Sequence, residues 1–196
     1  MKLERLLFAS IHGYLDPSNG AATASRDLLE LLRARGIDCR VLSTGVLDYR
    51  EETPLETVLE QLDVPVSRGR APLAKGGTAP IFDFTLAGVR VTLLPTTSSR
   101  LERSPTPREG ALFLDLAEQV FDRFRPQVML TYGGHPLSME LMATAGRRGV
   151  GVVFHLHNFA YNDISAFRFA DAVIVPTEYC RRHYARTLGL DSTLIP

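Results

Sequence analysis

Leu6-Leu7-Phe8-Ala9-Ser10-Ile11, near the start of the chain, is an apolar run with the length of a buried strand. A polar loop over residues 12–19 follows it, and apolar side chains then recur at helical spacing over residues 21–32. Gly36 stands where the C-terminal cap of that helix belongs, and residues 38–43 form a second apolar run. A strand, a loop, a helix and a strand in this order make a βαβ unit, which predicts a parallel sheet.

The rest of the chain continues this alternation. Thr106-Pro107-Arg108-Glu109 is a capping box with proline at the first helical position, and the helix that it begins ends before Pro126. Residues 45–80 are the least regular, and there we predict one short helix over 55–62 and otherwise loop. Residues 81–85 and 89–94 are predicted strands that form a hairpin or send the second strand into the main sheet. Further strands are expected over 128–132, 150–157 and 172–176, and further helices over 137–148 and from Thr177 to Leu188.

These elements predict an α/β, Rossmann-like, doubly wound and mostly parallel sheet with helices on both faces. One such domain is expected to cover residues 1–196, because no linker or repeat divides the chain. Lys plus Arg and Asp plus Glu are 22 each, and this balance disfavours a nucleic-acid partner. No apolar stretch approaches the roughly 20 residues of a transmembrane segment, and the first residues do not resemble a signal peptide. The two cysteines cannot form a disulfide framework, so a cytoplasmic location is expected.

Histidines and glycines gather directly after the predicted strands. Ligands of open parallel sheets bind beyond the carboxyl ends of the strands, where the strand order reverses, so we expect these residues to converge on one site. For any single histidine at a strand end, a hydrogen bond to a nearby backbone group is the more common role. The residues concerned are His12, Gly13, Tyr132, Gly133, Gly134, His135, His155, His157 and Asn158.

His155 and His157 are two positions apart, so both side chains point to one face if the strand extends that far. Such a pair could ligate a metal ion, but the sequence offers no third ligand and no His-Glu-x-x-His motif, and no metal site is predicted. His183 lies among arginines of the last helix and is expected on a solvated face.

The loop Ser18-Asn19-Gly20 opens the first helix, and its small residues would let an anion approach the backbone N–H groups of the helix N-terminus. Asn-Gly is also a common turn. The loop is not the Gly-x-Gly-x-x-Gly motif of dinucleotide-binding sites and is not a Walker loop. A Gly-x-Ser-x-Gly elbow is absent from the sequence as well, which disfavours an α/β-hydrolase.

Four segments, in order, resemble the N-terminal half of family 4 (retaining, group 1) glycosyltransferases of the GT-B fold. The loop Pro17-Ser18-Asn19-Gly20-Ala21 with residues 28–41 is similar to the family's Gly-Gly loop and its L-x-x-x-G-H-x-V segment. Arg125-Pro126-Gln127-Val128-Met129-Leu130 is similar to the P-D-V-V strand. Val152-Val153-Phe154-His155-Leu156-His157-Asn158 is similar to P-V-V-x-T-x-H, and Ala170-Asp171-Ala172-Val173-Ile174-Val175-Pro176-Thr177-Glu178 is similar to A-D-A-V-I-x-x-S-E.

The resemblance implies transfer of a sugar from a nucleotide-sugar donor to a sugar or lipid-type acceptor, with retention of configuration and without a metal cofactor. By motif position, His157 matches the active-site histidine that contacts the donor sugar. Ser18, Asn19 and Gly20 match the loop beside the diphosphate. The other strand-end residues, His12, Gly13, Tyr132, Gly133, His135, His155 and Asn158, would line the cleft or contact the acceptor.

The sequence departs from the family pattern in three places. Asn19 replaces the first glycine of the pair, and Tyr132 stands near a position where histidine is common. The chain stops at Leu194-Ile195-Pro196, where the family continues into a C-terminal domain that holds the nucleotide. We therefore expect that this domain is absent from the chain and that the isolated chain is inactive.

Two alternatives stay open at this point. One is a Rossmann-like small-molecule binding module without catalysis, in which Asn19 and Tyr132 mark a degenerate site. The other is a cofactor enzyme on a similar sheet, such as a methyltransferase, although the sequence has no glycine-rich motif after the first strand. The donor sugar, the acceptor and the oligomeric state are not encoded in any motif of the chain.

Overall fold

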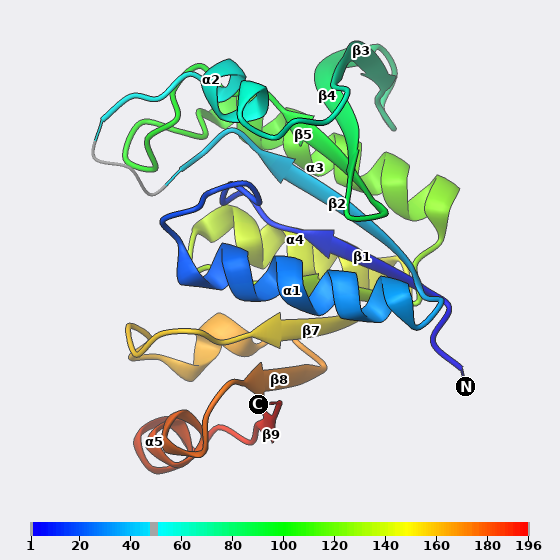
Figure 1. Cartoon of the computed structure of the whole chain (residues 1–196). Helices are drawn as coiled ribbons and strands as arrows, with labels where there is room; N and C mark the ends of the chain where they lie inside the picture. The colour runs from blue at the N-terminus through cyan, green and yellow to red at the C-terminus, as the bar shows by residue number, and fades with distance from the viewer. Residues whose placement is uncertain (1, 48–50, 196) are drawn as a thin grey trace.

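The computed structural model describes residues 2–47 and 51–195, and within these ranges nine strands form one sheet (Figure 1). The strand order is β3-β4-β5-β2-β1-β6-β7-β8-β9. Neighbouring strands from β5 to β9 pair in parallel, and β4 is antiparallel to both β3 and β5. The strands are β1 (Arg5–Ala9), β2 (Asp38–Thr44), β3 (Ser67–Pro72), β4 (Thr78–Leu86), β5 (Val89–Leu94), β6 (Val128–Thr131), β7 (Gly151–His155), β8 (Ala172–Val175) and β9 (Thr193–Leu194).

The strand order reverses at β1. From β1 the chain builds the sheet outward through β2 and β5, and it then returns to the other side of β1 with β6, β7, β8 and β9. Leu6 accordingly pairs with Cys39 of β2 and with Val128 of β6. The loops that leave β1 and β6 diverge at their carboxyl ends, and such a point leaves room for a ligand.

Helices cover both faces of the sheet, which confirms the predicted doubly wound architecture. On one face, α1 (Gly20–Ala34) and α2 (Leu55–Glu60) pack over a core that includes Phe8 and Val41. On the other face, α3 (Pro107–Phe124), α4 (Pro136–Arg147) and α5 (Glu178–Leu188) pack over a core that includes Leu7 and Met129. Alternate residues of β1 therefore enter different cores, which explains why this strand is apolar without a break.

The capping box at Thr106 forms as predicted. The Thr106 hydroxyl oxygen accepts a hydrogen bond from the backbone N–H of Glu109, and the Glu109 carboxylate accepts one from the backbone N–H of Thr106. Both arrangements considered for residues 81–94 occur at once. Leu86 and Val89 pair across a hairpin, and β5 also joins the main sheet in parallel with β2.

The prediction of loop over most of residues 45–80 was wrong for β3. This strand is an edge strand with Gly69 inside it and Pro72 at its end, and four of its six residues are exposed. An exposed edge strand has no apolar alternation to reveal it, and glycine and proline lower the strand propensity further. Residues 48–50 of the predicted loop, together with Met1 and Pro196, lie outside the described residues.

In the described part of the chain, no helix is both long and apolar enough to cross a membrane. The two cysteines are free thiols, and both are buried, Cys39 in β2 and Cys180 in α5. They belong to different cores on the two faces of the sheet.

Candidate functional site

A cavity of about 570 Å³ lies at the carboxyl ends of β1, β6 and β7, next to the N-terminus of α1. We call it the histidine cavity. His157 and eight of the residues predicted to form the donor loop or line the cleft border this cavity, and so do three residues without an assigned role. It is lined by His12, Ser18, Asn19, Gly20, Ala21, Tyr132, Gly133, Gly134, His155, His157, Asn158 and Tyr161.

Four aromatic rings succeed one another along the cavity. The imidazole of His12 stacks on the Tyr132 ring, with 5.6 Å between the centroids, and Tyr132 meets the His157 ring edge-on at 5.8 Å. The rings of His157 and His155 are closest, with centroids 3.7 Å apart. Residues from three different strand ends thus touch one another, and the cavity has a wall of rings rather than of flexible chains.

Gly133 allows this packing. Its φ is +102°, which side-chain-bearing residues rarely adopt, and a Cβ atom there would overlap the imidazole of His12. The glycine therefore has two functions at once: it turns the chain after β6 and leaves space for the His12 ring.

His155 and His157 lie on the same side, although β7 ends at His155, two residues earlier than predicted. Burial lowers the pKa of His157 to about 4, and burial together with the neighbouring His157 lowers the pKa of His155 to about 3. Both imidazoles are therefore neutral at pH 7. The buried Nδ1 atom of His155 and the buried Nε2 atom of His157 have no hydrogen-bond partner among the described residues.

The N-terminus of α1 forms the opposite side of the cavity. Asn19 is the N-cap residue of this helix, and its Oδ1 accepts hydrogen bonds from the N–H groups of Ala21 (2.8 Å) and Ala22 (3.1 Å). An anion at this helix end thus meets a side chain that already uses two of the N–H groups. Around Gly20, by contrast, no atom lies within 4 Å of the place where a Cβ would stand, so its backbone is open to a ligand.

Tyr161 is a cavity residue that the sequence analysis missed. Its backbone N–H donates to the hydroxyl of Tyr184 at 3.3 Å, and that hydroxyl donates to the Asn158 carbonyl at 2.8 Å. Burial raises the pKa of the Tyr161 hydroxyl to about 12, although a hydrogen bond with the Gly133 backbone works against the rise. The only sequence signal for Tyr161 is its position shortly after β7, because residues 158–163 follow no periodic pattern.

Two of the strand-end residues stay outside the cavity lining. Gly13 donates its N–H to the carbonyl of Val46, and a Cβ at this position would overlap that carbonyl oxygen. The glycine therefore serves a close backbone approach. His135 is the N-cap residue of α4, where its Nδ1 accepts a hydrogen bond from the N–H of Leu137 at 3.1 Å.

The expected solvated face around His183 is present only in part, because His183 itself is half-buried. Its ring meets Phe159 and Tyr184 edge-on, with 5.0 Å between the centroids in each case. Arg181, Arg182 and Arg186 are exposed as expected. The contact is with a loop that follows β7, so spacing along α5 alone could not reveal it.

A second cavity, of about 750 Å³, lies at the carboxyl ends of β2 and β5 on the same edge of the sheet. We call it the hydroxyl-lined cavity, because Thr53, Thr106 and residues 96–99 line much of it. Its walls are the two loops that follow these strands, and Leu47 and Arg100 join the loops by a parallel bridge. In the loop that follows β5, residues 96–99 are short and polar, and their hydroxyl groups line the cavity together with the apolar side chains of Pro54, Leu55 and Pro95.

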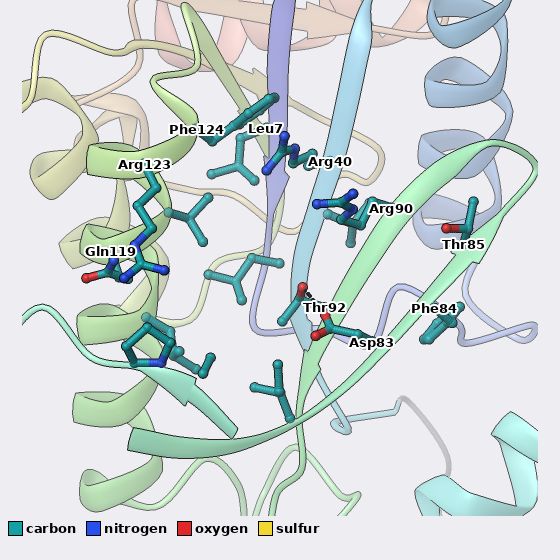
Figure 2. A pocket seen from close by; sticks show the side chains of 17 residues that line it. Leu7, Arg40, Asp83, Phe84, Thr85, Arg90, Thr92, Gln119, Arg123 and Phe124 are labelled. Atoms are coloured by element: carbon teal, nitrogen blue, oxygen red, sulfur yellow. Dashed lines mark hydrogen bonds between the residues drawn. The ribbon is translucent and has the colours of Figure 1, made fainter. Parts of the chain in front are cut away.

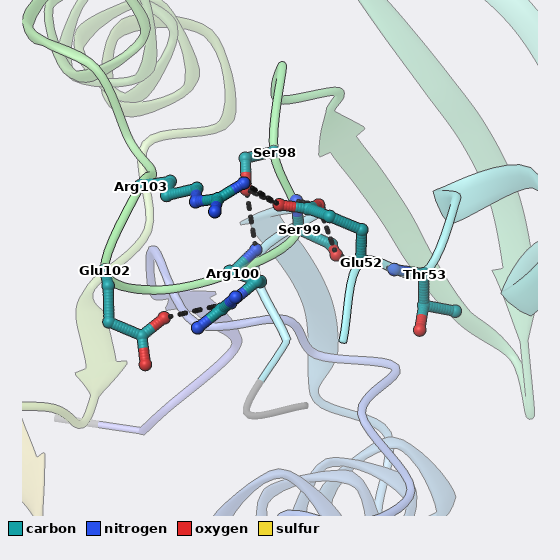
Figure 3. Close-up of polar contacts among 7 residues, drawn as sticks. All are labelled: Glu52, Thr53, Ser98, Ser99, Arg100, Glu102 and Arg103. Carbon is teal, nitrogen blue, oxygen red and sulfur yellow. Dashed lines mark hydrogen bonds and ion pairs between the residues drawn. The ribbon is translucent and has the colours of Figure 1, made fainter. Parts of the chain in front are cut away.

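Glu52 holds these two loops together (Figure 3). Its carboxylate accepts hydrogen bonds from the hydroxyl of Ser98 and from the backbone N–H of Ser99, the latter at 2.9 Å. These two hydrogen bonds keep the pKa of Glu52 below its ordinary value, and the bond from the Ser98 hydroxyl has the larger effect. Arg103 lies 3.9 Å from the same carboxylate. The hydroxyl-lined cavity thus contains an ionised carboxylate and a guanidinium at its rim.

The histidine cavity contains no charged side chain among its lining residues. Across residues 2–47 and 51–195, no group of three or more His, Cys, Asp or Glu side chains is arranged to hold a metal ion. The lining provides neutral imidazoles, hydroxyls, amides and the backbone of three glycines. Such groups suit a ligand rich in hydroxyl groups.

The fold and the position of this cavity define a class: the chain is a Rossmann-like α/β unit of the kind that occurs in GT-B glycosyltransferases. The sequence matches the family model of Glycosyltransferase Family 4 over residues 18–196, and the chain therefore belongs to this family. A search of curated protein sequences gave no match.

Solved structures agree on the fold. The catalytic domain of starch synthase IV from Arabidopsis thaliana, bound to ADP and acarbose, superposes with a TM-score of 0.57 at 11% identity, over 96% of this chain and 51% of that chain. A glycosyltransferase from Rickettsia africae gives 0.56 at 11% identity, over 100% of this chain and 43% of that one. A putative UDP-N-acetylglucosamine 2-epimerase from Listeria monocytogenes gives 0.54 at 11% identity, over 96% and 45%. The chain thus spans about half the length of these structures.

Proposed function

We propose that this chain is the acceptor-side domain of a retaining glycosyltransferase that transfers a sugar from a nucleotide-sugar donor to a sugar or lipid-type acceptor. In this reaction the bond between the anomeric carbon and the diphosphate oxygen breaks. A bond between the same carbon and an acceptor oxygen forms, and the acceptor hydroxyl loses its proton. The histidine cavity would hold the donor sugar, and the hydroxyl-lined cavity would hold the acceptor.

The observation that carries the proposal is a pair of buried imidazole nitrogens, Nδ1 of His155 and Nε2 of His157, that have no hydrogen-bond partner in the part of the chain that the structure describes. Buried polar atoms in native proteins are nearly always hydrogen-bonded, so these two atoms call for a partner supplied by a ligand or by water. Both rings are neutral at pH 7, and a neutral imidazole can donate or accept a hydrogen bond with a sugar hydroxyl. In this account His157 contacts the donor sugar and stabilises the charge that develops in the transition state.

None of the described residues that line the histidine cavity has a cationic side chain that could neutralise the charge of the leaving group. A departing nucleoside diphosphate needs cationic groups or many N–H donors for its charge. Ser18, Asn19 and Gly20 at the N-terminus of α1 would supply only part of this, since Asn19 already occupies two N–H groups. We therefore propose that a second domain of the same protein binds the nucleotide diphosphate through cationic side chains, without a metal ion.

The hydroxyl-lined cavity suits a polar acceptor. Its serine and threonine hydroxyls can exchange hydrogen bonds with a carbohydrate, and Glu52 and Arg103 are charged groups at its rim. Tyr132 and His12, together with Gly133, Asn158 and Tyr161, would position the donor sugar from the side of the rings. Two buried free thiols fit a reducing compartment, and we propose the cytoplasm.

The direct test is an assay of the complete polypeptide with a panel of nucleotide sugars and with sugar and lipid-linked sugar acceptors. We expect release of the nucleoside diphosphate together with a glycosylated product whose anomeric configuration, read by NMR, equals that of the donor. Donor binding without release of the diphosphate with any acceptor would favour the non-catalytic binding module. A product of inverted configuration would exclude the retaining mechanism.

A second measurement uses the 196-residue chain itself. Simple methyl glycosides, titrated into the chain at pH 7, are expected to shift the imidazole ¹H–¹⁵N signals of His155 and His157, because sugar hydroxyls would bond to Nδ1 and Nε2. The imidazole of His183 lies outside the cavity, packed on Phe159, and its signals serve as the control. Equal shifts at all three histidines would show nonspecific binding and would contradict the placement of the sugar.

A further inference from the structure

A third cavity, of about 480 Å³, lies on the α3 face of the sheet, between α3 and the strands β2, β4 and β5 (Figure 2). We call it the arginine cavity, because Arg40, Arg90 and Arg123 line it. Its volume falls in the range of small-molecule sites in proteins. It shares no lining residue with the histidine cavity or the hydroxyl-lined cavity, so it is a separate space.

Two of its arginines are direct neighbours across two strands. Arg40 of β2 and Arg90 of β5 are register partners in the parallel pair, and both side chains point to the α3 face. Like charges in directly opposite positions of a sheet are destabilising. The side chain of Arg90 is exposed and makes no hydrogen bond or ion pair with any residue that the structure describes.

The third arginine comes from the helix that faces these strands. Arg123 of α3 extends toward the cavity from the opposite wall (Figure 2), and its side chain likewise has no ion pair or hydrogen bond in the described ranges. Arg40 is held in place instead: its guanidinium stacks on the Phe124 ring at 4.1 Å and lies 3.6 Å from the Asp38 carboxylate. The one carboxylate of the lining, Asp83, accepts a hydrogen bond from the Thr92 hydroxyl at 2.5 Å.

Below the arginines the cavity is apolar. The apolar side chains that line it come from the sheet and from α3. They belong to the hydrophobic core on the α3 face of the sheet. They are mainly those of Leu7, Leu42, Ile81, Leu116, Val120 and Phe124. A charged rim over an apolar interior selects a molecule with the same division, an anionic head on a hydrocarbon body.

We propose that the arginine cavity binds an anionic amphiphile, a single hydrocarbon chain that carries a carboxylate or phosphate head. The head would lie between the guanidinium groups of Arg90 and Arg123, which have no ion pair among the described residues, and Arg40 would add a third guanidinium group. Guanidinium groups match both heads because they form bidentate hydrogen bonds with carboxylate and with phosphate oxygens. The hydrocarbon chain would occupy the space between α3 and the sheet. This site is independent of the glycosyl transfer proposed above.

The test is calorimetric titration of the 196-residue chain with laurate and with dodecyl phosphate, each below its critical micelle concentration. We expect saturable binding of one equivalent, and the tighter of the two probes identifies the head group. Acetate and inorganic phosphate test the need for the hydrocarbon chain, and octyl glucoside tests the need for the charge. Each of the three is expected to bind at least tenfold more weakly, and equal binding of any of them would overturn the proposal.

Variants locate the bound molecule. Arg90→Gln and Arg123→Gln remove one charge each at exposed positions and are expected to raise the Kd of the preferred probe at least tenfold. Arg108→Gln is the matched control, because Arg108 is an exposed arginine of the same helix as Arg123 but lies outside the cavity lining. Its Kd should stay within twofold of the parent chain. An equal loss in all three variants would show a nonspecific charge effect and overturn the site.

The Nε–Hε NMR signals of the arginines provide a readout that does not depend on a variant folding correctly. The signals of Arg40, Arg90 and Arg123 are expected to shift with the probe, and that of Arg108 is not. Shifts of the three cavity signals with protein concentration alone would mean that a second copy of the chain occupies the cavity, and this result would overturn the proposal.

Discussion

The histidine cavity lies at the carboxyl ends of the strands, whereas the arginine cavity lies on the α3 face of the same sheet, and the two are lined by different kinds of side chain. The histidine cavity has neutral buried rings and no charged lining residue, and it lies where the strand order reverses. The arginine cavity has three guanidinium groups over an apolar interior, and regular strands and a helix form it. The comparison shows that a topological switch point supplies polar, uncharged atoms for orienting a ligand, whereas side-chain alternation on paired strands can concentrate charge away from that point.

Acid is expected to distinguish the two cavities most strongly, because only the histidine cavity is lined by histidines, whose pKa lies near neutrality once the chain unfolds. His155 and His157 have pKa values of about 3 and about 4 in the folded chain and near 6.5 in the unfolded chain. Below pH 6.5 the unfolded chain therefore binds more protons, and the free energy of unfolding falls as the pH falls. We expect a loss of about 2 kcal/mol for each histidine between pH 7.5 and pH 5.

Urea unfolding at pH 7.5, 6.5, 5.75 and 5 measures this loss. Carboxylates with lowered pKa values, such as Glu109, titrate below this window. His155→Gln is expected to flatten the dependence by about one proton's contribution, or about 1.4 kcal/mol per pH unit. A parent chain whose stability does not change across the window would show that the two rings are not buried as neutral groups.

The next effect tests the ring wall of the histidine cavity. Gly133→Ala places a Cβ against the His12 ring at a φ of +102°, and we expect it to lower the free energy of unfolding by about 1–3 kcal/mol. Gly146→Ala is the matched control, because Gly146 lies in α4 with no atom within 4 Å of the added Cβ. This control should be neutral or more stable, since alanine is the better helix former. Equal thermal shifts of the two variants would refute the close packing of His12 on Gly133.

A smaller effect of the opposite sign is expected in the arginine cavity. Arg90→Thr removes one of two like charges in register and places a β-branched residue in a strand. Without any amphiphile, we expect the free energy of unfolding to rise by about 0.2–1 kcal/mol. Denaturant midpoints at low and high salt measure it, and the gain should shrink as salt screens the repulsion. A loss of stability in this variant would mean that Arg90 is a structural residue and not one kept for an anion.

Removal of metal ions is expected to have no effect on the rate of transfer. The proposed transfer uses no metal ion, so a chelator is expected to leave the rate of the complete protein unchanged. Activity that disappears with EDTA and returns with Mg²⁺ or Mn²⁺ would contradict this and would assign a metal ion to the diphosphate. The assay is the release of nucleoside diphosphate described above.

Much of the fold could be predicted because local signals agreed with the global architecture. The capping box at Thr106 and the unbroken apolar run of β1 each specify one structure, and both are present as predicted. The two-residue period of a strand predicted that the side chains of His155 and His157 point to the same side. They do so in the structure, although β7 ends at His155. β3 escaped prediction because an exposed edge strand lacks the alternation that burial imposes.

The site was less predictable than the fold because contacts between loops decide it. Asparagine is a preferred N-cap residue, yet Asn19 was predicted only as a donor-loop residue, and the only sequence signal for Tyr161 is its position shortly after β7. The arginine cavity also depends on the register of β2 against β5, and the whole irregular region, residues 45–80, lies between these two strands in the sequence. That register is fixed by long-range pairing and not by any motif near Arg40 or Arg90.

The central claim is that His157 contacts the donor sugar in the transition state. In the complete protein, His157→Ala is expected to lower kcat by about 100-fold while the melting temperature changes little. His135→Ser is the matched control, because it replaces a strand-end histidine outside the cavity with a residue that can also cap α4, and its kcat should stay near that of the parent. A His157→Ala protein with near-parental kcat, or one whose lost activity is accounted for by early melting, would contradict the account.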